Sequence, residues 1–165
     1  LYALLIVLLL VALTLSRNLV WSNDISLWGD VVTKSPGRSM PKLNLATAFA
    51  EACLFDQALF YYQAAMVIDP NYAEAYNGAG IAYMNQGQFE IAEKHYLKAL
   101  ALKPRYAAAH YNLALMYLKQ DKSYYAKAKE EFTAAILLEP RYRSLYSFIR
   151  FIDDELRQAN TPKQT

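Results

Sequence analysis

The chain has 165 residues, with 17 lysines and arginines against 15 aspartates and glutamates. This near-neutral balance argues against a nucleic-acid partner, which would select a basic surface. Cys53 is the single cysteine, which excludes an intrachain disulfide and a cysteine metal cluster, and we expect its thiol to be free and buried.

The first segment, 1–21, is predicted to be a transmembrane helix. It carries no charge before Arg17, and at about 1.5 Å per residue it would span roughly 30 Å, the thickness of a hydrocarbon core. A signal peptide would need a basic leading region and a small-residue cleavage motif. A buried core helix would show a polar stripe. Because the sequence begins with Leu1 and not methionine, we expect it to be the C-terminal piece of a longer membrane protein.

Residues 22–38 are predicted to form a connector and N-terminal capping helix. Ser22, Asn23 or Asp24 can cap this helix, which would run to about Lys34. Pro36 follows and cannot continue it.

The central part of the chain repeats. Successive prolines, at Pro36, Pro70, Pro104 and Pro140, are separated by 34, 34 and 36 residues. Ahead of the last three, a small residue, an aromatic residue and an alanine recur at fixed offsets. These positions are Ala58, Ala92 and Ala128; Tyr62, Tyr96 and Phe132; and Ala65, Ala99 and Ala135.

A second set of small residues, Ala46, Gly80 and Ala114, recurs earlier in each repeat. Two antiparallel helices can approach closely where small side chains face each other, and one such hairpin cannot bury its apolar face alone. The pattern therefore predicts an all-α solenoid of three helical hairpins, 39–72, 73–106 and 107–142. A two-residue insertion near Lys122 falls in the turn of the third hairpin, where insertions are tolerated.

The segment 143–159 is predicted to be a C-terminal capping helix with charged residues opposite its apolar stripe. The stripe comprises Leu145, Phe148, Ile149, Ile152 and Leu156. A solenoid needs such a terminal element with a polar outer face. The last residues, 160–165, are polar and are expected to form a tail.

The middle unit, from Ala73 to Pro104, resembles the tetratricopeptide repeat (TPR) at nearly all of its small and aromatic positions, and the resemblance extends over 39–142. Two features depart from the family pattern. The turn glycine is present as Gly87 but replaced by Cys53 and Asp121, and an early aromatic position holds Lys42 and His110. The resemblance implies a TPR α-solenoid, here following an N-terminal transmembrane helix.

In this family the first helix of each repeat lines a concave groove, and the resemblance implies that the groove binds a peptide or protein segment. Asn77, Asn85 and Lys119 would hold a peptide backbone or a carboxylate, while Met84, Tyr111 and Leu115 would receive apolar side chains. The Lys, Asn and Arg set with which some members hold chaperone tails is not matched. The full groove comprises Leu43, Thr47, Ala50, Glu51, Asn77, Ile81, Met84, Asn85, Tyr111, Leu115, Leu118 and Lys119.

The junction between 17 and 46 shows a second resemblance, to transmembrane-and-TPR glycosyltransferases. It rests on Arg17-Asn18, Trp21, Leu27-Trp28, Ser35-Pro36 and Asn44-Leu45-Ala46. This family's catalytic acidic residues lie in early membrane loops, and no position here corresponds to them. The resemblance implies repeats on the extracytoplasmic side, periplasmic or lumenal. The cations Arg17, Lys34 and Arg38 would by themselves favour a cytoplasmic placement.

No catalytic constellation, cofactor motif or metal-ligand spacing is found. His95 is expected on the outer face of a second helix, and His110 at a packing position. We therefore expect a membrane-anchored protein-binding module and not an enzyme. Two alternatives remain open: an accessory domain of a membrane glycosyltransferase acting on acceptor proteins, and a scaffold for a secretion or pilus assembly.

Overall fold

A computed structural model describes Val11 and residues 23–160. Apart from Val11, the predicted membrane helix over 1–21 lies outside the described residues. In the part of the chain that is described, no helix combines the length and apolarity that crossing a bilayer would require.

The described residues form eight α-helices and no strand, so the prediction of an all-α fold is confirmed. The helices belong to two compact units, the first ending at Pro70 and the second beginning at Asn71. Each unit is described by itself below.

The first unit contains three helices: α2 (Asp24–Lys34), α3 (Ser39–Glu51) and α4 (Phe55–Ile68). Asn23 caps α2, because its side-chain oxygen accepts a hydrogen bond of 2.9 Å from the backbone N–H of Ser26. Helix α3 packs against both α2 and α4.

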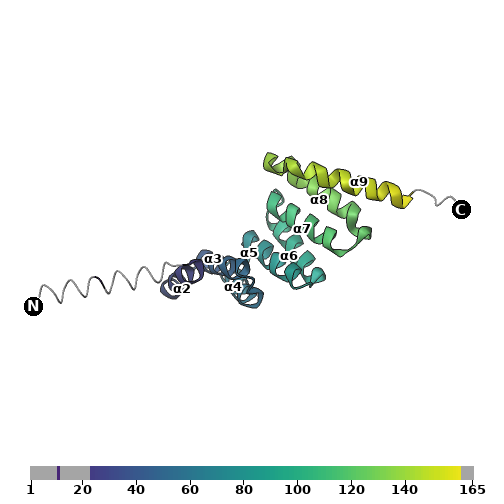
Figure 1. Ribbon diagram of the computed structural model, residues 1–165. Coiled ribbons are helices and arrows are strands. Elements are labelled where there is room, and N and C mark those ends of the chain that lie inside the picture. The colour runs from purple at the N-terminus through teal and green to yellow at the C-terminus, as the bar shows by residue number, and fades with distance from the viewer. Residues whose placement is uncertain (1–10, 12–22, 161–165) are drawn as a thin grey trace, which may run out of the picture. The chain divides into compact units, whose positions relative to one another are not determined.

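The second unit contains five helices, each packed against the next in chain order (Figure 1). They are α5 (Ala73–Asn85), α6 (Phe89–Leu102), α7 (Ala107–Gln120), α8 (Tyr125–Leu138) and α9 (Tyr146–Asn160). A short 3₁₀ turn, Lys122–Tyr124, accommodates the predicted insertion between α7 and α8.

Small residues make the close helix contacts, as the repeat pattern predicts. Ala46, Ala58, Ala92, Ala114 and Ala128 are fully buried. Gly80 is buried as well, and a methyl group added there would lie 2.7 Å from the ring of Tyr96. The aromatic residues that follow, Tyr62, Tyr96 and Phe132, fill the cores of the hairpins with at most 3% of their surface exposed.

The expectation of a buried thiol at Cys53 is wrong. Cys53 is exposed and its backbone has a φ of 58°, in the left-handed region. The equivalent turn between α5 and α6 places Gly87 at a φ of 76°. Cys53 therefore takes over the turn position of a glycine, and the turn itself lies at the surface.

The capping helix differs from the prediction in its start and in one apolar residue. Pro140 begins a 3₁₀ turn that extends to Leu145, so α9 starts at Tyr146, three residues later than expected. Leu145 and Ile152 are buried, but Phe148 is 47% exposed. The buried stripe of α9 is thus narrower than the sequence pattern predicts, and the helix keeps aromatic surface open to solvent.

Candidate functional site

The first helices of the second unit carry most of the predicted groove residues. Ile81 and Leu115 are half-buried, and Asn85 and Lys119 are exposed. The side-chain amide of Asn85 donates a hydrogen bond of 3.0 Å to the carbonyl oxygen of Ile81 in its own helix. These four residues offer both apolar surface and hydrogen-bond donors to a ligand.

Two predicted groove residues, Met84 and Asn77, are almost fully buried, with 8% and 7% of their surface exposed. The thioether of Met84 accepts a hydrogen bond of 3.9 Å from the hydroxyl of Tyr96. The side-chain oxygen of Asn77 accepts one of 3.0 Å from the side-chain amide of Asn112. Both residues support the helices from within and present little surface, which corrects their predicted role as contact residues.

Tyr111 is also tied into the fold. Its ring stacks on that of Tyr142, with 5.2 Å between centroids and 26° between planes, and lies 6.1 Å from the ring of Phe132. Tyr111 therefore forms a half-buried wall and is not a free side chain.

Thr47 and Glu51 belong to the first unit and lie exposed on α3. The hydroxyl of Thr47 donates to the carbonyl oxygen of Leu43 at 3.0 Å and lies 3.3 Å from that of Tyr62. Burial raises the pKa of Tyr62, and the charge of Glu51 adds to the increase, so the Tyr62 hydroxyl stays protonated.

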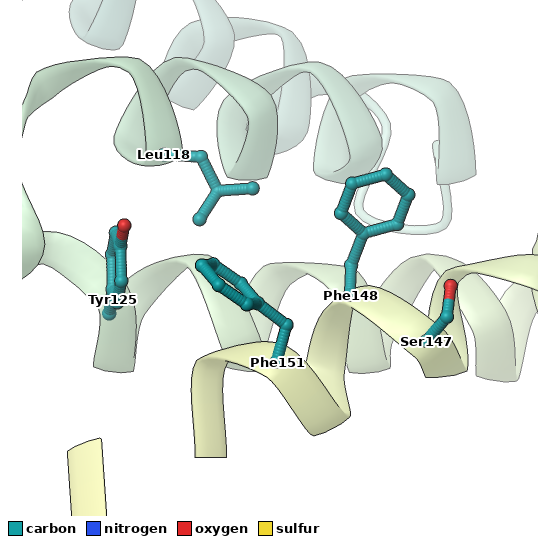
Figure 2. Close-up of a pocket in the computed structure, with 5 residues that line it drawn as sticks. All are labelled: Leu118, Tyr125, Ser147, Phe148 and Phe151. Carbon is teal, nitrogen blue, oxygen red and sulfur yellow. The ribbon is translucent and has the colours of Figure 1, made fainter. Parts of the chain in front are cut away.

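A hollow of about 440 Å³ lies between α7, α8 and α9 of the second unit. Figure 2 shows the rings of Phe148 and Phe151 and the side chains of Tyr125 and Leu118 directed into it, with Ser147 at its edge. The rings of Tyr125 and Phe151 lie 6.2 Å apart. Such a volume falls in the range of roughly 300–1,000 Å³ that is typical of ligand sites.

Only Leu118 among the hollow's residues was predicted to line the groove. The other four lie in α8 and α9, which the sequence pattern assigned to packing and capping. A sequence feature could have identified two of them. Ser147 and Phe151 follow Tyr111 and Leu115 by 36 residues, the same spacing that separates Pro104 from Pro140. Helix α9 thus continues the register of the groove-lining helices.

Ion pairs hold α9 in this position. The ammonium of Lys129 in α8 donates to the carboxylate of Asp153 at 2.5 Å, and Lys122 in the preceding turn pairs with Glu155. Both pairs lie toward the N-terminal end of α8, and they fix the helix that supplies Phe148 and Phe151.

The two histidines lie outside the hollow. His110 contacts the carboxylate of Glu131 through Nδ1 at 2.6 Å and the carbonyl oxygen of Pro104 through Nε2 at 3.2 Å. His95 does not point outward as predicted: its ring packs 5.1 Å from that of Tyr83, and burial lowers its pKa. In the described part of the chain, no three His, Cys, Asp or Glu residues are grouped to hold a metal ion.

Two family models match within these helices. A model described as TPR repeat matches residues 82–121, and one described as tetratricopeptide repeat matches residues 61–94. Together the two matches cover residues 61–121, from α4 to the end of α7. A search of curated protein sequences finds no significant match.

Solved structures of other proteins share the fold. The crystal structure of MamA is 25% identical, with a TM-score of 0.69 over 79% of this chain and 75% of that chain. A second MamA crystal structure is 24% identical, with a TM-score of 0.62 over 81% of this chain and 75% of that chain. The first TPR of Spaghetti (RPAP3), bound to the HSP90 peptide SRMEEVD, is 21% identical, with a TM-score of 0.67 over 73% of this chain and 94% of that chain. The TPR solenoid-like fold is therefore established.

Proposed function

We propose that the second unit binds a segment of a partner protein, with a large apolar side chain of that segment inserted into the hollow. The observation that carries this proposal is the open cluster of Leu118, Tyr125, Phe148 and Phe151 on a TPR fold. Phe148 and Phe151 are 47% and 50% exposed. Covering a large apolar side chain stabilises a complex by up to about 1.5–3 kcal/mol, so the hollow is a suitable anchor point.

Polar residues of the predicted groove would give the partner segment a second contact. Lys119 follows Leu118 directly and is exposed, and Asn85 occupies the matching position on α5. Lys119 is suited to pair with a carboxylate, and Asn85 is suited to contact a peptide backbone. The fold similarity to a TPR domain solved with a bound peptide supports this use of the surface.

We propose binding and not catalysis as the role of this chain, because its sequence offers no nucleophile with an adjacent base and no cofactor motif. We also propose that 1–21 anchors the chain in a membrane, with the repeats on the extracytoplasmic side. Both proposals rest on the sequence. Resistance of the full chain to alkaline carbonate extraction tests the anchor, and protease protection in intact vesicles tests the side.

A second candidate is an accessory domain of a membrane glycosyltransferase, and it rests on the junction residues around Trp21 and Trp28. The sequence encoded upstream of Leu1 decides it. Additional membrane spans with an acidic loop would favour this alternative, and a start codon directly ahead of Leu1 would exclude it.

Binding is tested with the full chain in detergent and a displayed library of short peptides. We expect selected peptides to share a large apolar residue and to lose affinity for the Phe151→Ser variant. The matched control is Leu97→Ser on α6, since Leu97 is 49% exposed and does not line the hollow. Equal loss for both variants, or none for either, would refute this function.

A further inference from the structure

Helix α4 is apolar on two faces. Its inner face, with Ala58, Tyr62, Ala65 and Met66, is buried. Its outer face, defined here by Phe60, Ala64, Val67 and Ile68, follows the spacing of one helical stripe. Phe60 is 68% exposed, Val67 72% and Ile68 39%. An exposed apolar stripe on a surface helix indicates a site that another molecule covers.

The equivalent helix of the next repeat is charged at two of the same four positions. Counting 34 residues on from Phe60 and Ala64 leads to Lys94 and Lys98 of α6. In addition, α4 contains a single charged residue, Asp56, whereas α6 contains Glu90 and Glu93 besides the two lysines. The same four positions hold Lys94, Lys98, Ala101 and Leu102 in α6, and Glu130, Ala134, Leu137 and Leu138 in α8. Leu137 is 79% exposed, so part of this stripe recurs in the second unit, but of these three helices α4 alone is apolar at all four positions.

Repeat packing does not cover this face in the second unit. Helix α6 packs against both α5 and α7, yet Lys94, Lys98 and Ala101 on its outer face stay exposed. In the first unit α2 packs against α3, and among the described residues it does not contact α4. The occupant of the outer face of α4 is therefore not supplied by the packing of its own hairpin.

The size of the face argues against a second copy of the chain as this occupant. A stable protein–protein interface buries about 800 Å² per partner and involves roughly 20–30 residues on each side. The outer face of α4 has four side chains on one helix. A contact this small is effective only when another link already holds the two surfaces together.

The chain supplies such a link. Residues 12–22 lead directly into Asn23, the cap of α2, and they continue an apolar segment that is free of charge before Arg17. With 1–21 in a bilayer, the first unit is held within a few residues of the lipid. Tyr61, whose ring packs edge-on against Phe60 at 5.1 Å, has the amphipathic ring that favours a membrane interface.

We propose that the outer face of α4 lies on the lipid surface, with Phe60 and Val67 at the boundary between headgroups and acyl chains. This inference rests on the proposed membrane anchor. The contact would fix how the first unit stands on the membrane, in the manner of an interfacial helix held by a neighbouring span.

The test uses the full chain, with Cys53→Gly to remove the native thiol, in phosphatidylcholine vesicles that contain spin-labelled lipid. An environment-sensitive fluorophore is attached to Val67→Cys or, as the matched control on α6, to Ala101→Cys. We expect a blue-shifted emission and quenching by the lipid at position 67, and neither effect at position 101. Phe60→Lys, which copies Lys94 of α6, should abolish the quenching at position 67.

Carbonate extraction of the same vesicles separates the two proposals. If the chain resists extraction but the label at position 67 behaves like the label at position 101, the lipid contact is refuted and the membrane anchor is retained. An extracted chain overturns both. Disulfide crosslinking between copies at position 67 that rises with protein density, without quenching, would assign the face to a second copy and overturn the proposal. The comparison of the two labels does not depend on the folding of the Phe60→Lys variant.

Discussion

The hairpins α3/α4 and α5/α6 are the same structure built from different residues. Ala46 stands where the second hairpin has Gly80, and Tyr62 stands where it has Tyr96. The hydroxyl groups of the two rings have different neighbours. The hydroxyl of Tyr62 lies 3.3 Å from that of Thr47, whereas the hydroxyl of Tyr96 donates to the thioether of Met84.

The absence of a methyl group at Gly80 leaves room for the ring of Tyr96. Without a Cβ at Gly80, the ring of Tyr96 moves against the backbone of α5, within 2.7 Å of where that methyl would be. In the first hairpin the equivalent position carries the methyl group of Ala46, and the hydroxyl of Tyr62 lies near Thr47 instead. The backbone pattern of the repeat is therefore more strongly determined than the arrangement of side chains inside it.

Substitution of Gly80 should have the largest effect on stability. Gly80→Ala adds a methyl group against Tyr96, which is fully buried and cannot move away without disturbing the core. Overpacking costs about 1–3 kcal/mol, which outweighs the gain of about 1 kcal/mol in helix propensity. We expect net destabilisation of the second unit, measured by faster amide hydrogen exchange in α5 and α6.

Removing only the hydroxyl of Tyr96 from the same variant provides the control. In Gly80→Ala with Tyr96→Phe, the loss of the hydroxyl should not relieve the contact, because the nearest atoms are ring carbons. Gly80→Ala alone with unchanged or slower exchange would show that Tyr96 can adopt the position of Tyr62 without cost.

The next largest effects are expected at the turns of the two hairpins, which hold Cys53 and Gly87. An L-residue in the left-handed region costs roughly 1–2 kcal/mol, so Gly87→Ala should destabilise the second unit by about that amount. Cys53→Gly should stabilise the first unit by less, up to about 1 kcal/mol, because glycine loses more entropy on folding. Urea unfolding of both variants measures the two effects. Changes of the same sign would contradict the equivalence of the turns.

Much of this fold follows from the sequence. The 34-residue spacing locates the buried alanines and aromatics, because close helix contact demands small residues at fixed places. The thiol of Cys53 was misplaced, because burial frequencies for cysteine say nothing about a turn that needs a positive φ. His95 was misplaced because a polar ring can pack between Tyr76 and Tyr83 while one nitrogen remains without a partner.

The candidate site was predicted less completely. Helix positions alone assigned Met84 and Asn77 to the groove, but the depth of a side chain depends on neighbours such as Tyr96 and Asn112, which differ between repeats. The hollow depends on where α9 begins. That point is set by the 3₁₀ turn after Pro140, a detail that an apolar stripe does not reveal.

The two hairpins should also differ in how their stability depends on pH, because His95 in α6 occupies the position of Tyr61 in α4. Burial lowers the pKa of His95 in the folded state, whereas an unfolded histidine titrates near about 6.5. As the pH falls through 6.5 toward the lowered pKa, the unfolded chain binds a proton that the folded unit does not, so stability is lost. In His95→Tyr this part of the loss should disappear.

Hydrogen exchange monitors the unfolding of the second unit by urea. It is measured at pH 7.5 and pH 5.5 in the native chain and in the His95→Tyr variant. His110 is present in both, so its contribution cancels in the comparison. An identical pH dependence of the two chains would mean that the ring of His95 is hydrated in the folded state.

The smallest effect is expected from an ion pair that only the second hairpin has. Lys103 donates to the carboxylate of Glu74 at 2.9 Å, and their side chains are 50% and 37% exposed. The matching position on α3 holds Met40. Because exposed pairs contribute about 0.2–1 kcal/mol and are screened by salt, Glu74→Met should lower the stability of the second unit slightly in low salt and hardly at all in high salt. A loss that persists in high salt would show that Glu74 acts through its position in the first turn of α5 and not through Lys103.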